Sequence, residues 1–373
     1  MRSSGLSNLT IIIPTISRPQ FVLRQFEYWR VSDAQVVILD GAQKPIEIPE
    51  HLMSSNIRYV CTGTRFNERL ATAGDYVSTA YCALLPDDEF FLFSGLHAAI
   101  ARLESDRDLI GCVGRCLGFF VDQGRFLTRD MYRDWKPFSE RATTQLARLD
   151  EDLPPNSTHI ATYAVARSVA WTQVLSNSYS TFYSCAYTYE RLTNLQRSLL
   201  GRTEIIEDLL WMRSLENPPI SDSTTPRTNG RDLVSWARNS SLTHEVSQYR
   251  SSALELILHT GLELDTAKDF ERRFFEVGVE QQALKEARGR RSVKKRLRNL
   301  ALRYTPQVLR TAAKRYAPNK VLAFSGWQGL ALDEMCASLE ERGTRFDRED
   351  LEFVMGLSLK LDAAAHRARS STA

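Results

Sequence analysis

The sequence predicts an α/β fold in which helices cover both faces of a mostly parallel sheet. Over residues 1–115, short apolar runs rich in Ile and Val alternate with segments that carry apolar residues at helical spacing. The apolar runs are continuous, which is typical of parallel strands buried on both faces. From about residue 233 the pattern is helical, so we expect a helical C-terminal region.

The first 115 residues are expected to contain five strands and three helices. The strands are predicted at 9–13, 35–41, 56–60, 81–86 and 108–114. The helices are predicted at 18–30, 66–80 and 94–105, with Pro19 in the first turn of one and Ser94 as the N-cap of another.

The middle of the chain sets the expected domain boundaries. Residues 160–175 are predicted as a strand running into a helix, and 201–216 as a helix capped by Thr203. Residues 217–232 are rich in Pro, Ser, Thr and Asn, which indicates a long loop. We therefore expect a sheet domain over 1–216, a linker over 217–232 and a helical region over 233–373.

Composition excludes several classes of protein. The 373 residues are 43% hydrophobic and 25% charged with a net charge of +3, as in an ordinary globular protein and unlike a general polyanion binder. Six cysteines include only one close pair, so we expect buried free thiols in a reducing compartment and no zinc site. No run of about 18 apolar residues is present, and the N-terminal apolar stretch is too short for a signal peptide. A cytoplasmic protein is expected.

Three adjacent acids, Asp87, Asp88 and Glu89, follow a buried strand in CALLPDDEFFLF. They either form a polar turn that faces the N-terminus of the next helix, or hold Mg²⁺ or Mn²⁺. In the second case phosphate oxygens and water would complete the coordination shell of the metal. Residues 14–18 and Asp40 follow two other predicted strands. Because ligands bind beyond the carboxyl ends of parallel strands, the pattern favours a cation site for a diphosphate.

The segments LTIIIPTISRPQFVLRQFEYW, VVILDG and YCALLPDDEF, in this order, resemble the opening of a GT-A-fold glycosyltransferase. More narrowly, they are similar to bacterial family 2-like enzymes that build capsule and lipopolysaccharide glycans. The resemblance covers roughly residues 9–215. It departs from the family at Ile16 and Ser17, where Tyr and Asn are usual, and at Glu89, which replaces a third Asp. It implies a Rossmann-like, nucleotide-sugar-binding catalytic domain.

The resemblance implies a role for each matched position. It places the donor nucleotide against Pro14, Thr15, Arg18, Asp40, Arg69 and Asp87, and the metal against Asp87, Asp88 and Glu89. Asp40 would bind the base, although an Asp before Gly is also a common turn former. Arg69, or Arg65 near it, would face the base or the diphosphate, and a solvated helix arginine is the alternative.

Inverting sugar transfer needs a base that deprotonates the acceptor hydroxyl. The resemblance assigns this role to Asp208 first and Glu207 second, whereas acids that stabilise a helix dipole are the alternative. It also implies that His159 and Tyr163 contact the sugar or the acceptor, with a packed core histidine as the alternative for His159. Trp211 either stacks on an acceptor ring or packs in the core, and core packing is favoured.

Residues 285–320 contain thirteen Lys or Arg against one Glu and have an amphipathic helical pattern. Such a helix fits anionic lipid headgroups or an anionic glycan, which would hold the protein peripherally at the inner face of the cell membrane. Packing between domains or subunits is the alternative. Nucleic acid is disfavoured because the segment has few aromatic residues for base stacking.

The predicted function is metal-dependent transfer of a sugar from a nucleoside diphosphate sugar to a glycan or lipid-linked glycan. A sugar nucleotidyltransferase is one alternative, but it normally has a glycine-rich loop after the first strand, and PTISRP has no glycine. A non-catalytic scaffold that binds glycans or partner enzymes is the other. The acids at 87, 88 and 208 argue weakly against it.

Overall fold

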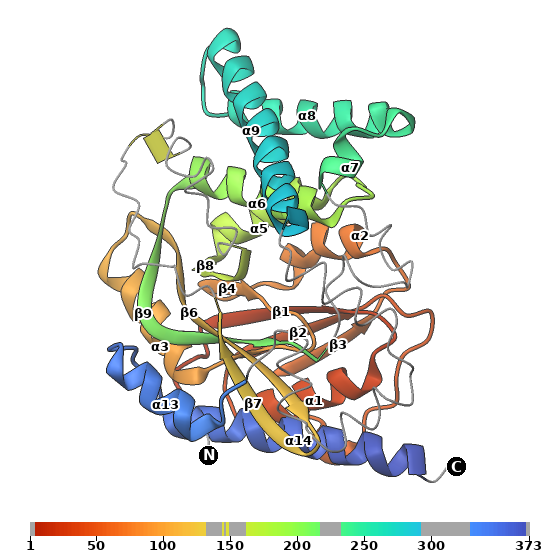
Figure 1. Ribbon diagram of the computed structural model, residues 1–373, viewed down its shortest axis with the longest axis vertical. Helices are drawn as coiled ribbons and strands as arrows, with labels where there is room; N and C mark the ends of the chain where they lie inside the picture. The colour runs from red at the N-terminus through yellow and green to blue at the C-terminus, as the bar shows by residue number, and fades with distance from the viewer. Residues whose placement is uncertain are drawn as a thin grey trace.

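One mixed sheet lies between two layers of helices (Figure 1). The structure is a computed structural model and describes residues 4–131, 144, 147–148, 162–216, 233–291 and 329–370. The described strands are β1 Leu9–Thr15, β2 Gln35–Asp40, β3 Ile57–Cys61, β4 Tyr81–Leu84, β5 Phe90–Phe91, β6 Leu109–Asp122, β7 Arg125–Asp130, β8 Val165–Arg167 and β9 Arg202–Ser214. The described α-helices are α1 Pro19–Trp29, α2 Phe66–Ala71, α3 Phe93–Ser105, α5 Ser168–Tyr179, α6 Ala186–Leu200, α7 Leu233–Ala237, α8 Thr243–Leu258, α9 Leu264–Arg291, α13 Leu332–Glu341 and α14 Arg348–Ser370.

The sheet is mostly parallel, as predicted. Among the described residues its order is β3-β2-β1-β4-β8-β6-β9-β5, and β7 pairs with β6. β1 is parallel to β2 and β4, β2 is parallel to β3, and β6 is parallel to β9. β8 runs antiparallel between β4 and β6. The carboxyl ends of β1, β2, β4 and β9 therefore face the same edge of the sheet.

Alternate side chains of β1 enter two hydrophobic cores, one on each face of the sheet. Ile11 and Ile13 pack with residues of α1, α3, α13 and α14, whereas Ile12 packs with residues of α2 and α5–α9. The C-terminal helices are thus divided between the faces, with α7–α9 on one and α13 and α14 on the other (Figure 1). Burial on both faces explains why the strands are continuous apolar runs.

Several predicted features are confirmed. The five strands expected before residue 115 correspond to β1–β4 and β6, and Pro19 begins α1. All six cysteines are free thiols, and five of them are buried.

Residues 202–214 form the strand β9, so the helix expected over 201–216 is wrong. β9 pairs in parallel with β6 along its length, with register shifts at three places. A Cβ at Gly114 of β6 would overlap the backbone of Asp208, so the glycine lets the two strands approach. Thr203 is consequently a strand residue and caps no helix.

The expected N-cap at Ser94 is also wrong. α3 begins at Phe93, and its N-cap is Leu92. The backbone N and the Oγ of Ser94 both donate to Oδ2 of Asp350, each over 2.8 Å. A carboxylate of α14 therefore binds the free amide in the first turn of α3.

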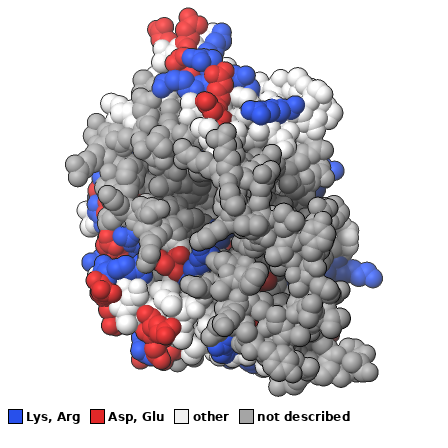
Figure 2. Space-filling model, in the orientation of Figure 1, with Lys and Arg blue, Asp and Glu red and all other residues white. Residues whose placement is uncertain are grey.

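Charges of both signs are mixed at the end formed by α8 and α9 (Figure 2). On α9, Arg272 pairs with Asp269 and Glu276. The basic segment 285–320 begins within α9, and its residues beyond Arg291 lie outside those described. No helix in the described ranges is long and apolar enough to cross a membrane.

Candidate functional site

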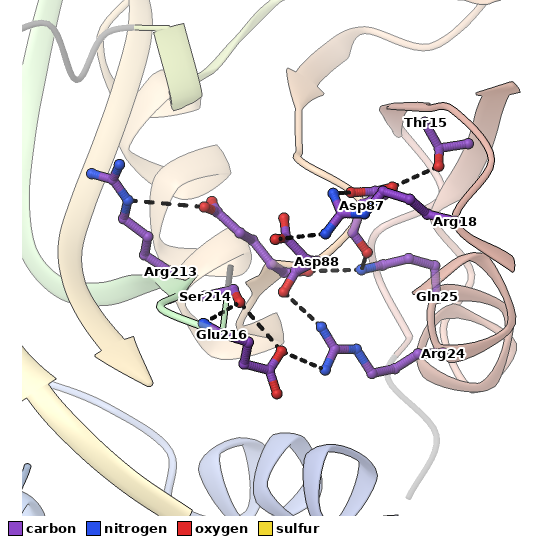
Figure 3. A network of polar contacts seen from close by, with 10 residues as sticks. Thr15, Arg18, Arg24, Gln25, Asp87, Asp88, Arg213, Ser214 and Glu216 are labelled. Carbon is purple, nitrogen blue, oxygen red and sulfur yellow. Dashed lines mark hydrogen bonds and ion pairs between the residues drawn. The ribbon is translucent and has the colours of Figure 1, made fainter. Parts of the chain in front are cut away.

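Polar side chains from neighbouring strand ends meet at the carboxyl edge of the sheet (Figure 3). Thr15 ends β1, and its Oγ1 donates to Oδ2 of Asp87 over 2.6 Å. Arg18 lies in the turn before α1 and donates to Oδ1 of Asp87 over 2.5 Å and to Oδ2 of Asp88 over 3.0 Å. The structure thus brings together four of the predicted site residues. One guanidinium bridges Asp87 and Asp88, called the aspartate pair below.

The turn before α1 directs Arg18 toward these acids. Ser17 has a φ of 51°, in the left-handed region that residues other than glycine rarely adopt. Pro19 then starts the helix with a fixed φ. The guanidinium of Arg18 lies 4.2 Å from the ring centroid of Phe21, which restricts its position further.

Asp87 has a raised pKa. Its side chain is 4% exposed, and burial raises its pKa to about 6. Arg18 and Thr15 oppose the rise because they stabilise the charged form, whereas Asp88 adds to it. The aspartate pair therefore concentrates negative charge in a poorly solvated place and holds the cationic side chain of Arg18 there.

Glu89 turns away from the aspartate pair. Its Oε2 accepts a hydrogen bond of 2.6 Å from Nε1 of Trp211, and its Oε1 lies 4.0 Å from Nε of Arg213. Burial raises the pKa of Glu89 well above 4.5, and the charge of Asp88 adds to the rise. Within the described ranges, no group of three His, Cys, Asp or Glu side chains is arranged to hold a metal ion. The expected metal-ligand role of Glu89 finds no support in this geometry, because its oxygens face the core and β9.

The aspartate pair has the ligand type that one divalent cation takes, but Thr15 and Arg18 donate to three of its four carboxylate oxygens in this structure. Mg²⁺ and Mn²⁺ prefer carboxylate oxygens, and one or two protein carboxylates suffice when phosphate oxygens and water complete the shell. Arg18 shows that this pair accepts positive charge between its two carboxylates.

Two further charged residues were not selected from the sequence: Arg213 lies beside Glu89, and Glu190 lies within electrostatic reach of Arg213. Arg213 is near the end of β9, and its side chain is 39% exposed. Glu190 of α6 is half-buried and within electrostatic reach of Arg213. Burial raises the pKa of Glu190 to about 7, and Arg213 opposes the rise. A carboxylate that titrates near neutrality can take up and release a proton during a reaction.

Among the described residues, none donates a hydrogen bond to Glu190. It is also the only acid in AYTYERLTNLQRSLL, residues 186–200. That isolation in a helix of otherwise uncharged and basic residues is the sequence signal that could have found it.

Asp40 and Arg69 already have protein partners. Asp40 is fully buried, and its two oxygens accept hydrogen bonds from the backbone N of Ala42 (2.8 Å) and the hydroxyl of Tyr59 (2.7 Å). These contacts match the turn-forming alternative. Arg69 is 2% exposed and donates to the carbonyl of Thr64. The expected contact of either side chain with the donor base has no support in this conformation.

Tyr163 and Trp211 stack, with ring centroids 4.4 Å apart and an interplanar angle of 27°. Trp211 is 1% exposed, so the favoured alternative of core packing is confirmed. Pro14 is half-buried within β1 and lies opposite Leu39 of β2. His159 lies outside the described residues.

Glu207 and Asp208 lie within β9, and each is paired with an arginine. Arg115 donates to Oε2 of Glu207 over 2.9 and 2.7 Å. Arg345, between α13 and α14, donates to both oxygens of Asp208 over 3.0 and 2.6 Å. Trp211 is the residue of β9 that contacts Glu89. Asp208 lies three residues before it, a distance of about 10 Å along the strand. The structure therefore does not bring either acid to the aspartate pair, and their catalytic role stays a prediction.

Neither a protein-family model nor a curated protein sequence matches the chain. Among solved structures it is similar to S. aureus TarS residues 1–349, with 12% identity and a TM-score of 0.42 over 96% of this chain and 91% of that one. The same TarS fragment in complex with UDP gives a TM-score of 0.43, and in complex with UDP-GlcNAc 0.44, both at 12% identity. At these scores the likeness establishes neither a family nor an activity.

Proposed function

We propose that this chain transfers a sugar from a nucleoside diphosphate sugar to an acceptor hydroxyl, with inversion at the anomeric carbon. Such a reaction needs positive charge on the leaving diphosphate and a base near the acceptor. The supporting observation is that both kinds of group occur together. The aspartate pair binds the guanidinium of Arg18, the adjacent Glu89 lies 4.0 Å from Arg213, and Arg213 acts electrostatically on Glu190, whose pKa is about 7.

Each group then has a role. The acceptor oxygen attacks the anomeric carbon, and the bond from that carbon to the β-phosphate oxygen breaks. The diphosphate leaves with the electron pair, and the hydroxyl proton passes to a carboxylate oxygen of Glu190. Arg213 supplies positive charge to the leaving group. Asp88, with Asp87, would hold Mn²⁺ or Mg²⁺, which would supply positive charge to the departing diphosphate.

Glu190 is a better base than Asp208 in this arrangement. Both oxygens of Asp208 accept charged hydrogen bonds from Arg345, so an acceptor hydroxyl would have to displace that arginine to reach either oxygen. Glu190 has the opposite environment, because burial favours its protonated form. Its pKa near neutrality suits a group that must gain a proton and lose it again.

The acceptor we propose is a glycan or a lipid-linked glycan of the capsule or lipopolysaccharide type. The support is the sequence resemblance together with residues 285–320, whose thirteen basic residues would hold the protein at an anionic membrane surface. Binding of the full chain to vesicles with and without anionic lipid tests this part separately.

Thermal melting with UDP, CDP and GDP, each with and without Mn²⁺, tests the donor. We expect one diphosphate to raise Tm, and Mn²⁺ to increase the shift. A ligand at 100 times its Kd stabilises by about 2.7 kcal/mol. The double variant Asp87→Asn, Asp88→Asn should lose the shift, whereas the matched variant Asp208→Asn should keep it. Absence of a shift with every nucleotide on the wild type would reject the proposal.

A further inference from the structure

Two adjacent side chains of α1 hold the backbone of the three acids. Nε2 of Gln25 donates to the carbonyl oxygens of Asp87 (3.0 Å) and Glu89 (2.8 Å). Nη2 of Arg24 donates to the carbonyl oxygen of Asp88 over 2.7 Å. Each of the three consecutive carbonyl groups therefore has a partner on α1 (Figure 3).

Both α1 side chains are themselves fixed. Gln25 is fully buried, and its Oε1 accepts a hydrogen bond of 2.8 Å from Nε1 of Trp29, which orients the amide group toward the carbonyls. Arg24 is 3% exposed, and its guanidinium lies 4.9 Å from the ring centroids of Phe21 and Phe90. Neither side chain can move far without breaking its own packing.

Holding the carbonyl groups decides where the carboxylates point. With the backbone fixed in this way, Asp87 and Asp88 face Arg18, whereas Glu89 faces Trp211. A site that binds a charged ligand depends on such placement, because shifts of about 1 Å in its polar groups already reduce binding and rate.

Arg24 also joins the acids to the end of β9. Its Nη1 donates to Oε2 of Glu216 over 3.1 Å, and the same oxygen accepts a hydrogen bond of 3.2 Å from Oγ of Ser214. Glu216 follows β9 closely, near Arg213. Burial lowers the pKa of Arg24, and the charge of Glu216 opposes this change. One buried arginine thus contacts both the main chain of the three acids and Glu216 after β9.

We propose that Arg24 and Gln25 are positioning residues for the donor diphosphate. They orient the aspartate pair through its main chain, and Arg24 couples this orientation to the end of β9. The inference rests on the proposed function for the identity of the ligand, but the backbone placement can be measured without any ligand.

The test uses Gln25→Met in the full chain, because Met has a similar length and no hydrogen-bond donor. The matched control is Asn56→Ala. Nδ2 of Asn56 donates to the carbonyls of Trp29, Ser32 and Ala34 over 3.1, 3.1 and 2.9 Å, at the other end of α1. The control therefore loses the same kind of contact without touching the acids.

Two readouts separate positioning from stability. The first is the indole N–H resonance of Trp211 in ligand-free, ¹⁵N-tryptophan-labelled protein, which reports on Glu89. The second is the calorimetric Kd for UDP, CDP and GDP with Mn²⁺. We expect Gln25→Met to shift the Trp211 resonance and to weaken the best diphosphate at least tenfold. Asn56→Ala should change neither the Trp211 resonance nor the Kd, even if it lowers Tm as much as Gln25→Met does.

An unchanged Trp211 resonance, or an unchanged Kd beside a shifted resonance, would overturn the positioning role. If Gln25→Met shifts the Trp211 resonance but the wild type binds no diphosphate, the role of Gln25 in placing the backbone is supported and the proposed function is rejected. Glu216→Gln provides a second variant if Gln25→Met does not fold, because Glu216 is 18% exposed. We expect it to weaken the diphosphate several-fold, and an unchanged Kd would reject the coupling through Arg24.

Discussion

The indole nitrogen of Trp211 donates a hydrogen bond of 2.6 Å to Oε2 of Glu89 inside the protein core. This contact joins β9 to the acids that follow β4. It also gives Glu89 a different environment from that of the other two acids. Two of them hold Arg18, and the third faces a tryptophan that is 1% exposed. Glu89 therefore packs as part of the core, whereas Asp87 and Asp88 are the acids that we propose for the site.

Glu89→Gln is expected to fold and to bind the donor as well as the wild type, because the amide oxygen can still accept from Trp211. The raised pKa of Glu89 means that the folded state prefers the protonated acid. Stability should thus fall in the wild type as pH rises above about 4.5, and Gln removes this fall. Melting from pH 4.5 to 8 measures it.

Glu89→Ala is the control for this substitution. It leaves the indole N–H of Trp211 without a partner and should cost about 1–3 kcal/mol. If a stable Glu89→Gln protein instead loses Mn²⁺-dependent diphosphate binding, Glu89 is a metal ligand, as the sequence resemblance implies.

Glu190→Gln is expected to lower kcat by about 10²–10⁴-fold while the donor Kd changes little, because it removes the base and leaves the aspartate pair intact. In the wild type, kcat/KM should rise with pH up to about 7, where Glu190 loses its proton. The variant should lack this limb of the profile. A flat profile in the wild type would contradict the assignment.

The same variant should be more stable than the wild type at pH 8. The folded-state pKa of Glu190 is raised from 4.5 to about 7, so its contribution to stability is present below pH 4.5 and lost as pH rises to 7. Gln carries no charge to bury, and the gain should be on the order of 2 kcal/mol at pH 8. Chemical denaturation at pH 5 and pH 8 checks it, and an equal effect at both would argue against a titrating Glu190.

The aspartate pair could be predicted from sequence because its contacts follow from local order. Thr15 ends β1 and Arg18 follows it, Asp87 and Asp88 follow β4, and these two strands are neighbours in parallel register. Glu190 could not be predicted in this way. Its pKa depends on burial and on the charge of Arg213 in β9, and the order of residues in α6 does not reveal either of these.

β9 was predicted as a helix for a related reason. Leu209, Leu210, Trp211 and Met212 are all buried, because helices cover both faces of the sheet. A strand buried on both faces loses its alternation of polar and apolar residues, and a short apolar run then fits a helix equally well. The register shifts against β6 remove the remaining periodicity.

Asp208→Asn is expected to leave kcat and the donor Kd unchanged and to destabilise the fold slightly. The pair with Arg345 is largely at the surface, since the arginine side chain is 70% exposed. Such pairs contribute about 0.2–1 kcal/mol. Steady-state kinetics and melting measure both effects, with Glu207→Gln as the matched variant. A large loss of kcat with normal donor binding in Asp208→Asn alone would restore Asp208 as the base.

Ser17→Asn is expected to stabilise the turn that carries Arg18. Ser17 has a φ of 51°, and Asn tolerates the left-handed region better than Ser, so the gain should be about 0.5–1 kcal/mol. Gln123→Asn is a matched variant remote from the site, because Gln123 and Gly124 both have positive φ in the β6–β7 hairpin, where Asn-Gly is preferred. Both variants should raise Tm, and only Ser17→Asn should change the Kd for the diphosphate, because only that turn carries Arg18. A lower Tm for Ser17→Asn beside a higher one for Gln123→Asn would show that the Ser17 side chain has a role of its own.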